Sequence, residues 1–140
     1  MFAAVLTITV GQLQAQRYVD EIFTDAQITV STNVSYGENI SLLNTVLGAF
    51  AGQSVPPDTI PLIMDVYQPT QSADAETERP LIIYLPTGNF LPPVVNGAPT
   101  GSIKDSSCVN IAKQLAKRGY VCAVVSYRQG WNPASPNQIV

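Results

Sequence analysis

The sequence predicts an α/β fold with a mainly parallel sheet and an antiparallel first hairpin. Two observations support this expectation: continuous apolar runs at residues 81–85 (LIIYL) and 120–127 (YVCAVVSY), and a segment with helical periodicity between them. Uninterrupted apolar runs are typical of strands buried on both faces of a parallel sheet. A helix that connects two such strands is almost always a right-handed crossover, which makes the strands parallel.

Composition limits the size and the chemistry of this fold. The chain has 140 residues, of which 46% are hydrophobic and 12% are charged, so it is long enough for one domain with one core. A formal net charge of -3 provides no basic surface for nucleic acid. The sequence has no histidine, and its two cysteines form no Cys-x-x-Cys pair. We therefore expect neither a metal site nor a cofactor.

The amino terminus has the pattern of an export signal. Residues 1–10 (MFAAVLTITV) are apolar and uncharged, and the first charge is Arg17. We interpret residues 1–16 as a secretory signal peptide, which predicts a secreted or periplasmic protein. The run is too short for a stable membrane span. The alternative is a buried first strand, because apolar residues alternate with threonines over residues 6–10.

The first half of the remaining chain is expected to form strands separated by a break. Residues 28–34 alternate between apolar and polar positions, as in a half-buried strand. Residues 41–50 (SLLNTVLGAF) fit either a short helix or a strand extension, and the prolines within 52–58 end that segment. Residues 59–67 (TIPLIMDVY) alternate again and form the next strand. Residues 70–80 are polar and acidic, so we expect an exposed loop.

The crossover helix is predicted between Asp105 and Gly119. Asp105 and the two following serines offer N-cap oxygens. Five residues share one helical face: Cys108, Ile111, Ala112, Leu115 and Ala116. Gly119 is the expected stop. About ten helical residues, at about 1.5 Å each, separate Cys108 from Cys122, so we expect both thiols to remain free.

Three stretches of sequence resemble one enzyme family. They read LIMDVYQP, RPLIIYLPTGNF and LAKRGYVCAVVSYRQGWNP, and they lie within residues 60–133. This text is similar to the amino-terminal half of a secreted α/β-hydrolase of the carboxylesterase type. The resemblance implies that residues 17–140 form the amino-terminal part of an α/β-hydrolase fold, incomplete and ending before the nucleophile elbow.

The resemblance also implies an oxyanion hole in the loop after the buried strand. Ester hydrolysis creates a tetrahedral oxyanion that backbone N–H groups must stabilise. The family's two donors correspond here to Gly88 and Asn89. Pro86 stands in place of the family's usual histidine and Thr87 in place of its first glycine, and the alternative is a plain turn.

Other residues near this loop are interpreted with the same family in view. Phe90 and Trp131 are candidates for lining an acyl or alcohol pocket, against the alternative of simple packing. Asp65 corresponds to a structural position of the family, and we expect it at the surface or in a hairpin.

The catalytic triad is missing from the sequence. The closest text to the G-x-S-x-G elbow surrounds Ser54, but it lacks the second glycine and precedes Pro56. The family's Ser, acid and His lie downstream of the matched strands, whereas this chain ends at Val140. The resemblance thus implies a fragment of a serine esterase or lipase whose complete form takes a small-molecule ester. The alternatives are a noncatalytic secreted binding module and a nucleotide-binding domain, the latter disfavoured by the lack of G-x-G-x-x-G.

Overall fold

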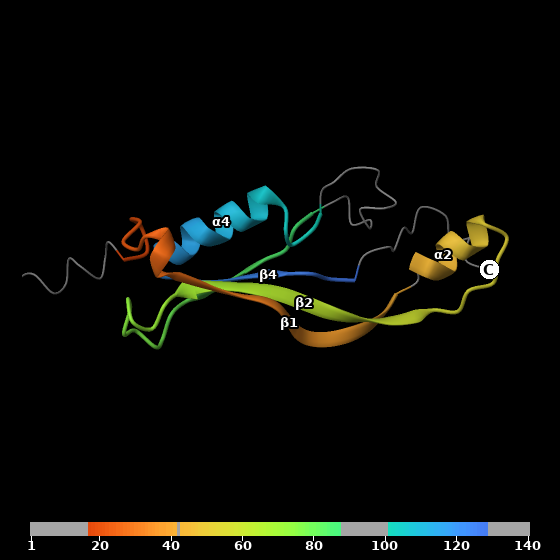
Figure 1. Cartoon of the computed structure of the whole chain (residues 1–140), viewed down its shortest axis with the longest axis horizontal. Coiled ribbons are helices and arrows are strands. Elements are labelled where there is room, and N and C mark those ends of the chain that lie inside the picture. Colours follow the sequence, from red (N-terminus) through yellow and green to blue (C-terminus); the bar gives the residue numbers. More distant parts are fainter. Residues whose placement is uncertain (1–16, 42, 88–100, 129–140) are drawn as a thin grey trace, which may run out of the picture.

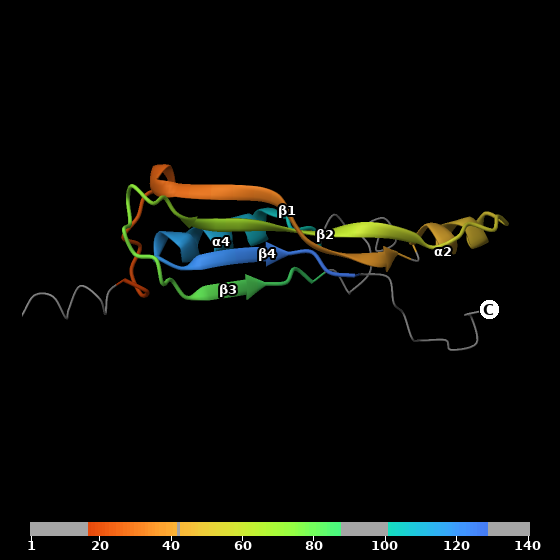
Figure 2. The ribbon, with the colours of Figure 1, turned by 90° about the horizontal axis from the view of Figure 1, so that it is seen from below.

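The computed structural model describes residues 17–41, 43–87 and 101–128. These residues form one four-stranded sheet and two α-helices (Figure 1). In chain order the elements are η1 (Asp25–Gln27), β1 (Ile28–Ser41), α2 (Leu43–Phe50), β2 (Asp58–Pro69), β3 (Leu81–Tyr84), α4 (Ser106–Lys117) and β4 (Val121–Val125). The strand order across the sheet is β1-β2-β4-β3, as Figure 2 shows.

The sheet is mixed and mostly antiparallel, so the predicted mainly parallel α/β-hydrolase sheet is wrong. β1 pairs with β2 antiparallel, β2 pairs with β4 antiparallel, and β3 alone pairs with β4 in parallel. The reason lies in the connections. A parallel pair needs a crossover such as α4, whereas the chain between β1 and β2 turns back and leaves these strands antiparallel. The predicted antiparallel first pair is present.

The core lies between α4 and one face of the sheet. Cys108, Ala112 and Ala116 are the buried residues of α4, and the two alanines let the helix backbone approach the strands closely. The sheet contributes Tyr67, Cys122 and Val124 to this core. Both cysteines are free and buried, which confirms the expectation that they form no disulfide.

The opposite face of β3 is open in the described part of the chain. Leu81 and Ile83 are 58% and 61% exposed, whereas Ile82 and Tyr84 pack against the core. The expected burial of residues 81–85 on both faces is therefore not observed. β3 is also the last strand of the order, so it pairs on one side only within the described residues.

The amino-terminal segment closes one end of the sheet. The N–H groups of Ile22 and Phe23 both donate to the Lys117 carbonyl at the end of α4. Gly119 follows the helix with φ +94°, as the predicted stop requires. A Cβ on Gly119 would lie 3.2 Å from Nε of Arg17, so this glycine also makes room for the segment. None of the helices described is long and apolar enough to cross a bilayer.

Candidate functional site

The candidate site is the edge of the sheet where β3 and β4 end. These strands are parallel, so their carboxyl ends meet at the same edge, the usual position of ligands in open sheets with crossover helices. Buried Pro86 and exposed Thr87 continue from β3 toward the predicted oxyanion loop. Gly88, Asn89 and Phe90, and Trp131 beyond β4, lie outside the described residues.

The chain returns to this edge at residues 101–105, where Asp105 holds the backbone. One carboxylate oxygen of Asp105 accepts hydrogen bonds from the N–H groups of Gly101 at 2.7 Å and Ser102 at 3.1 Å. Asp105 occupies the N-cap position of α4 but makes no side-chain cap bond to the helix. The predicted cap oxygen therefore orders the preceding turn instead, which fixes where this loop ends against the sheet.

An ion pair between a buried carboxylate and a half-exposed lysine attaches the same turn to β2. The Asp65 side chain is 1% exposed, and its Oδ2 lies 2.5 Å from Nζ of Lys104. Its Oδ1 accepts a 2.9 Å hydrogen bond from the N–H of Asn33 in β1. The expectation of a surface position for Asp65 is wrong, because a carboxylate within an apolar strand is stable when it has charged and polar partners.

Register places this ion pair level with the end of β3. Tyr84 is opposite Val124, and Val124 is opposite Asp65 on its other side. The pair therefore lies two strands from Tyr84, at the same height in the sheet. Asn33 has φ +55°, within an irregularity of the β1–β2 register, and this turns its N–H toward Asp65. β1, β2 and the loop before α4 are thus joined at the candidate edge.

Two tyrosines and one cysteine beneath this edge have raised pKa values. Burial raises the pKa of Tyr84, and the adjacent Cys108 thiol raises it further. Burial also raises the pKa of Cys122 to about 11. Burial and then the charge of Asp65 raise the pKa of Tyr67. Protonated thiols and phenols are poor nucleophiles, so these described side chains support the edge without supplying an attacking group.

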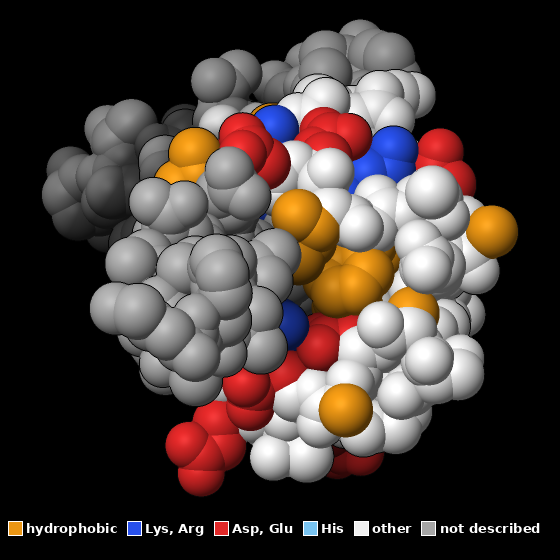
Figure 3. All heavy atoms as spheres, turned by 90° about the vertical axis from the view of Figure 1, so that its left-hand side faces the viewer, with side chains coloured by type: hydrophobic (Ala, Val, Ile, Leu, Met, Phe, Trp, Pro, Cys, Tyr) orange, Lys and Arg blue, Asp and Glu red, His pale blue; other side chains and the backbone are white. Residues whose placement is uncertain are grey.

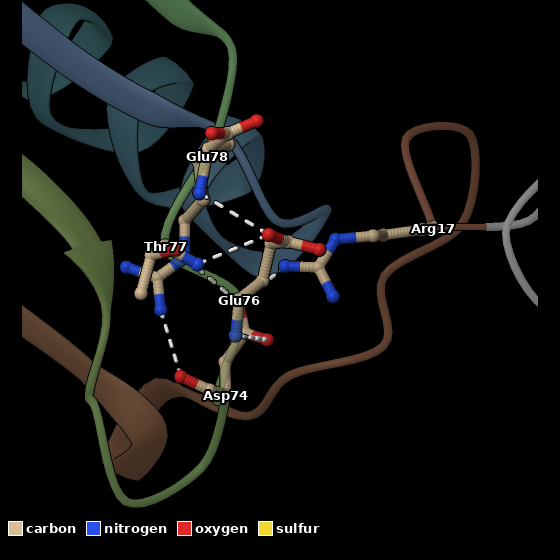
Figure 4. Close-up of polar contacts among 6 residues, drawn as sticks. Arg17, Asp74, Glu76, Thr77 and Glu78 are labelled. Atoms are coloured by element: carbon tan, nitrogen blue, oxygen red, sulfur yellow. Dashed lines mark hydrogen bonds and ion pairs between the residues drawn. The ribbon is translucent and has the colours of Figure 1, made fainter.

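A second buried carboxylate lies at the opposite end of the sheet. Asp74, 6% exposed, accepts hydrogen bonds from Arg17 and from Nε of Arg79 at 2.9 Å. Figure 4 shows Arg17 reaching from the amino-terminal segment to the loop before β3. Figure 3 views this end and shows acidic and basic side chains around a small apolar group. The cluster joins two segments that are distant in sequence, which is a structural role.

The hydrogen bonds of this second cluster favour the ionised form of Asp74. Burial alone disfavours the Asp74 carboxylate, but hydrogen bonds from Arg17, the Glu76 N–H and Arg79 outweigh it and hold the pKa of Asp74 below its usual value. The hydrogen bond to Asp74 in turn raises the pKa of Arg17. Little in the sequence predicts the cluster around Asp74, because residues 70–80 have the composition of an exposed acidic loop. Asp65 was detectable, since it interrupts the apolar text LIMDVY.

Comparison with known proteins identifies no relative. No family model, no curated protein and no solved structure matches the chain. Among the described residues, no group of three or more Cys, Asp or Glu side chains is arranged to hold a metal ion. A function must therefore be argued from the residues themselves.

Proposed function

We propose that this chain supplies the oxyanion-binding loop of a secreted serine carboxylic ester hydrolase, an esterase or lipase. The donors are the backbone N–H groups of Gly88 and Asn89. The observation that carries the proposal is the text PTGNF, which begins two residues after the end of β3, the strand that pairs in parallel with β4.

Stabilisation of the oxyanion requires only backbone N–H groups from this loop. As a nucleophile attacks an ester carbonyl, its oxygen becomes an oxyanion, and preorganised N–H donors lower the barrier. Gly88 has no side chain to block close approach, and Asn adopts positive φ more readily than most residues. A replacement of glycine by Asn89 thus leaves the donor in place.

The described residues hold the chain on both sides of this loop. Pro86 is buried where the chain leaves β3, and the return at residues 101–105 is held by Asp105 and by the ion pair of Lys104 with Asp65. Phe90 and Trp131 are the proposed apolar lining for the acyl or alcohol group.

The nucleophile and the general base must come from outside these residues. A serine hydroxyl is a weak nucleophile until a base takes its proton, and the sequence has no histidine. The chain by itself is therefore expected to hydrolyse no ester. The proposal therefore requires that the complete enzyme supply a serine elbow, an acid and a histidine from other residues.

The test compares donor variants in the complete reading frame with p-nitrophenyl acetate as substrate. Gly88→Pro removes one N–H and should lower kcat about a hundredfold to a thousandfold with little change in KM. Asn89→Gly keeps the N–H and should retain activity, which makes it the matched control. Unchanged kcat in Gly88→Pro would refute the oxyanion assignment. Saturable turnover by the 140-residue chain alone would refute the claim that the nucleophile and the general base come from other residues.

Export is part of the same proposal. Signal removal after residue 16 would keep Arg17, whose side chain binds Asp74. The apolar run at residues 1–10 and this preserved contact support cleavage at that point. Mass spectrometry of the protein recovered from the medium or the periplasm should give a mature chain that starts at Arg17. Recovery of residues 1–16 on the mature protein would favour the buried-strand interpretation.

A noncatalytic secreted binding module is the second candidate, and the absence of histidine favours it. The two candidates differ in what the reading frame encodes. A frame without a serine elbow and without histidine would select the binding module over the hydrolase.

A further inference from the structure

The β1–β2 pair extends far beyond the rest of the sheet and forms an arm. β2 pairs with β4 only over residues 64–67, whereas β1 and β2 remain paired out to Ser41 and Asp58. We define the arm as residues 37–41 of β1, residues 58–62 of β2, and α2 with the turn after it. Figures 1 and 2 both show α2 at the far end of this arm, away from α4 and the core.

The tip of the arm is apolar and exposed. The Phe50 side chain at the end of α2 is 86% exposed, and Leu47 is 40% exposed. Ile40 and Ile60, on the two strands just below, are 53% and 36% exposed. The register pairs Asn39 with Ile60 and Ile40 with Thr59, so these isoleucines lie on opposite faces of the ribbon. Each face of the arm therefore exposes one isoleucine near its end.

Charge is excluded from the same region. From Asn39 to Pro57 the sequence has no acidic or basic residue, and acids stand at both boundaries, Glu38 and Asp58. α2 has neither an acidic first turn nor a basic last turn. A chain segment without charged side chains has a small desolvation penalty when it leaves water. Transfer of an exposed Phe side chain out of water is favourable.

From this charge pattern and this position we propose that the arm tip inserts into a neutral, zwitterionic lipid surface. α2 is about 12 Å long, and interfacial segments penetrate about 5–10 Å, so Phe50 and Leu47 can enter while Glu38 and Asp58 stay hydrated. The two acids oppose binding to anionic lipid, and the arm has no basic residue to attract it. The inference concerns the arm alone and does not depend on the oxyanion loop.

Vesicle flotation with the whole chain tests the proposal. The chain should bind phosphatidylcholine vesicles, and admixture of phosphatidylserine should weaken binding at low salt. Phe50→Ala should lower the partition coefficient about tenfold, as expected for a large apolar side chain that leaves a lipid environment. Leu47→Ala should lower it less, and Leu81→Ala, which removes an exposed leucine of β3, should leave it unchanged.

Depth is measured separately with Phe50→Trp, which keeps an aromatic group at the tip. Its fluorescence, relative to the parent chain, should shift to the blue on vesicles and be quenched by brominated acyl chains. Failure of the parent chain to bind phosphatidylcholine, or an equal loss in Leu81→Ala, overturns the proposal. So does sedimentation that shows a lipid-independent dimer dissolved by Phe50→Ala, which would assign the tip to a second copy of the chain.

Discussion

Replacement of Asp74 by Asn should destabilise the fold far more than its place in an acidic loop implies. The Asp74 side chain is 5% exposed, and those of Arg79 and Arg17 are 7% and 18% exposed. Asn retains the shape and one acceptor but removes the charge that both guanidinium groups face. Loss of one partner from a buried ion pair typically costs about 3–5 kcal/mol. We expect Asp74→Asn to lower the free energy of unfolding by about that amount at pH 7.

Urea unfolding followed by circular dichroism measures this loss. Glu78→Gln is the matched control, because it removes the same charge from an exposed residue of the same loop and should change stability by less than about 0.5 kcal/mol. The difference between parent and Asp74→Asn should also depend on pH.

The pH dependence follows from the lowered pKa of Asp74. A carboxyl group whose pKa is lower in the folded state stabilises the fold fully above its unfolded pKa, which is about 3.9. That contribution is lost as the pH falls through the folded pKa. The two chains should therefore differ most above about pH 5 and converge in stronger acid. A loss at pH 7 no larger than that of Glu78→Gln, or a difference that grows toward pH 3, would refute the reasoning.

Three further predictions concern the candidate edge and the core. Lys104→Met leaves the Asp65 carboxylate buried with one N–H partner and should lower the unfolding free energy by about 3–5 kcal/mol. Asp65→Asn should cost less, because the Lys104 side chain is 49% exposed and can be hydrated. Chemical denaturation compares the two variants, and equal losses of stability would contradict this prediction. Asn33→Gly should be tolerated and Asn33→Val should cost about 1–3 kcal/mol at φ +55°, as thermal unfolding would show; equal stability would mean that this backbone is not strained. Cys108 and Cys122 should react with a thiol reagent at pH 8 only after unfolding, because both are buried and the pKa of Cys122 is about 11; rapid reaction of the folded chain would contradict this.

Local sequence patterns located most of the elements. The alternation at residues 59–67 lies within β2, the apolar run at 81–85 contains β3, and the periodicity from Asp105 to Gly119 brackets α4. These signals are local because a helix or a strand must present one face to the core. The spacing of apolar residues at 41–50 fitted either a helix or a strand, and the structure shows the helix α2 there.

Of the strand pairings, the parallel one of β3 with β4 was predicted from the crossover helix and is confirmed, but the place of β2 beside β4 was not available from such signals. Nothing in the residues of β4 states that it lies between β2 and β3, because each of these strands offers apolar side chains to either neighbour. The candidate site shows the same limit. Asp65 was visible as a charge in an apolar strand, but its partners Lys104 and Asn33 come from 39 and 32 residues away. Distant partners of this kind are set by topology.

The position of β4 has a consequence for the order in which the chain folds. Of the strands described, β4 leaves the ribosome last, yet it separates β2 from β3. About fifty residues lie between the end of β2 and the start of β4. During synthesis the β1–β2 pair can form early, whereas β3 must wait without a neighbour until β4 is translated. At about 5–20 residues per second, the delay between the synthesis of β3 and that of β4 lasts several seconds. The nascent chain therefore exposes the apolar segment LIIY without a strand partner while residues 85–125 are being synthesised.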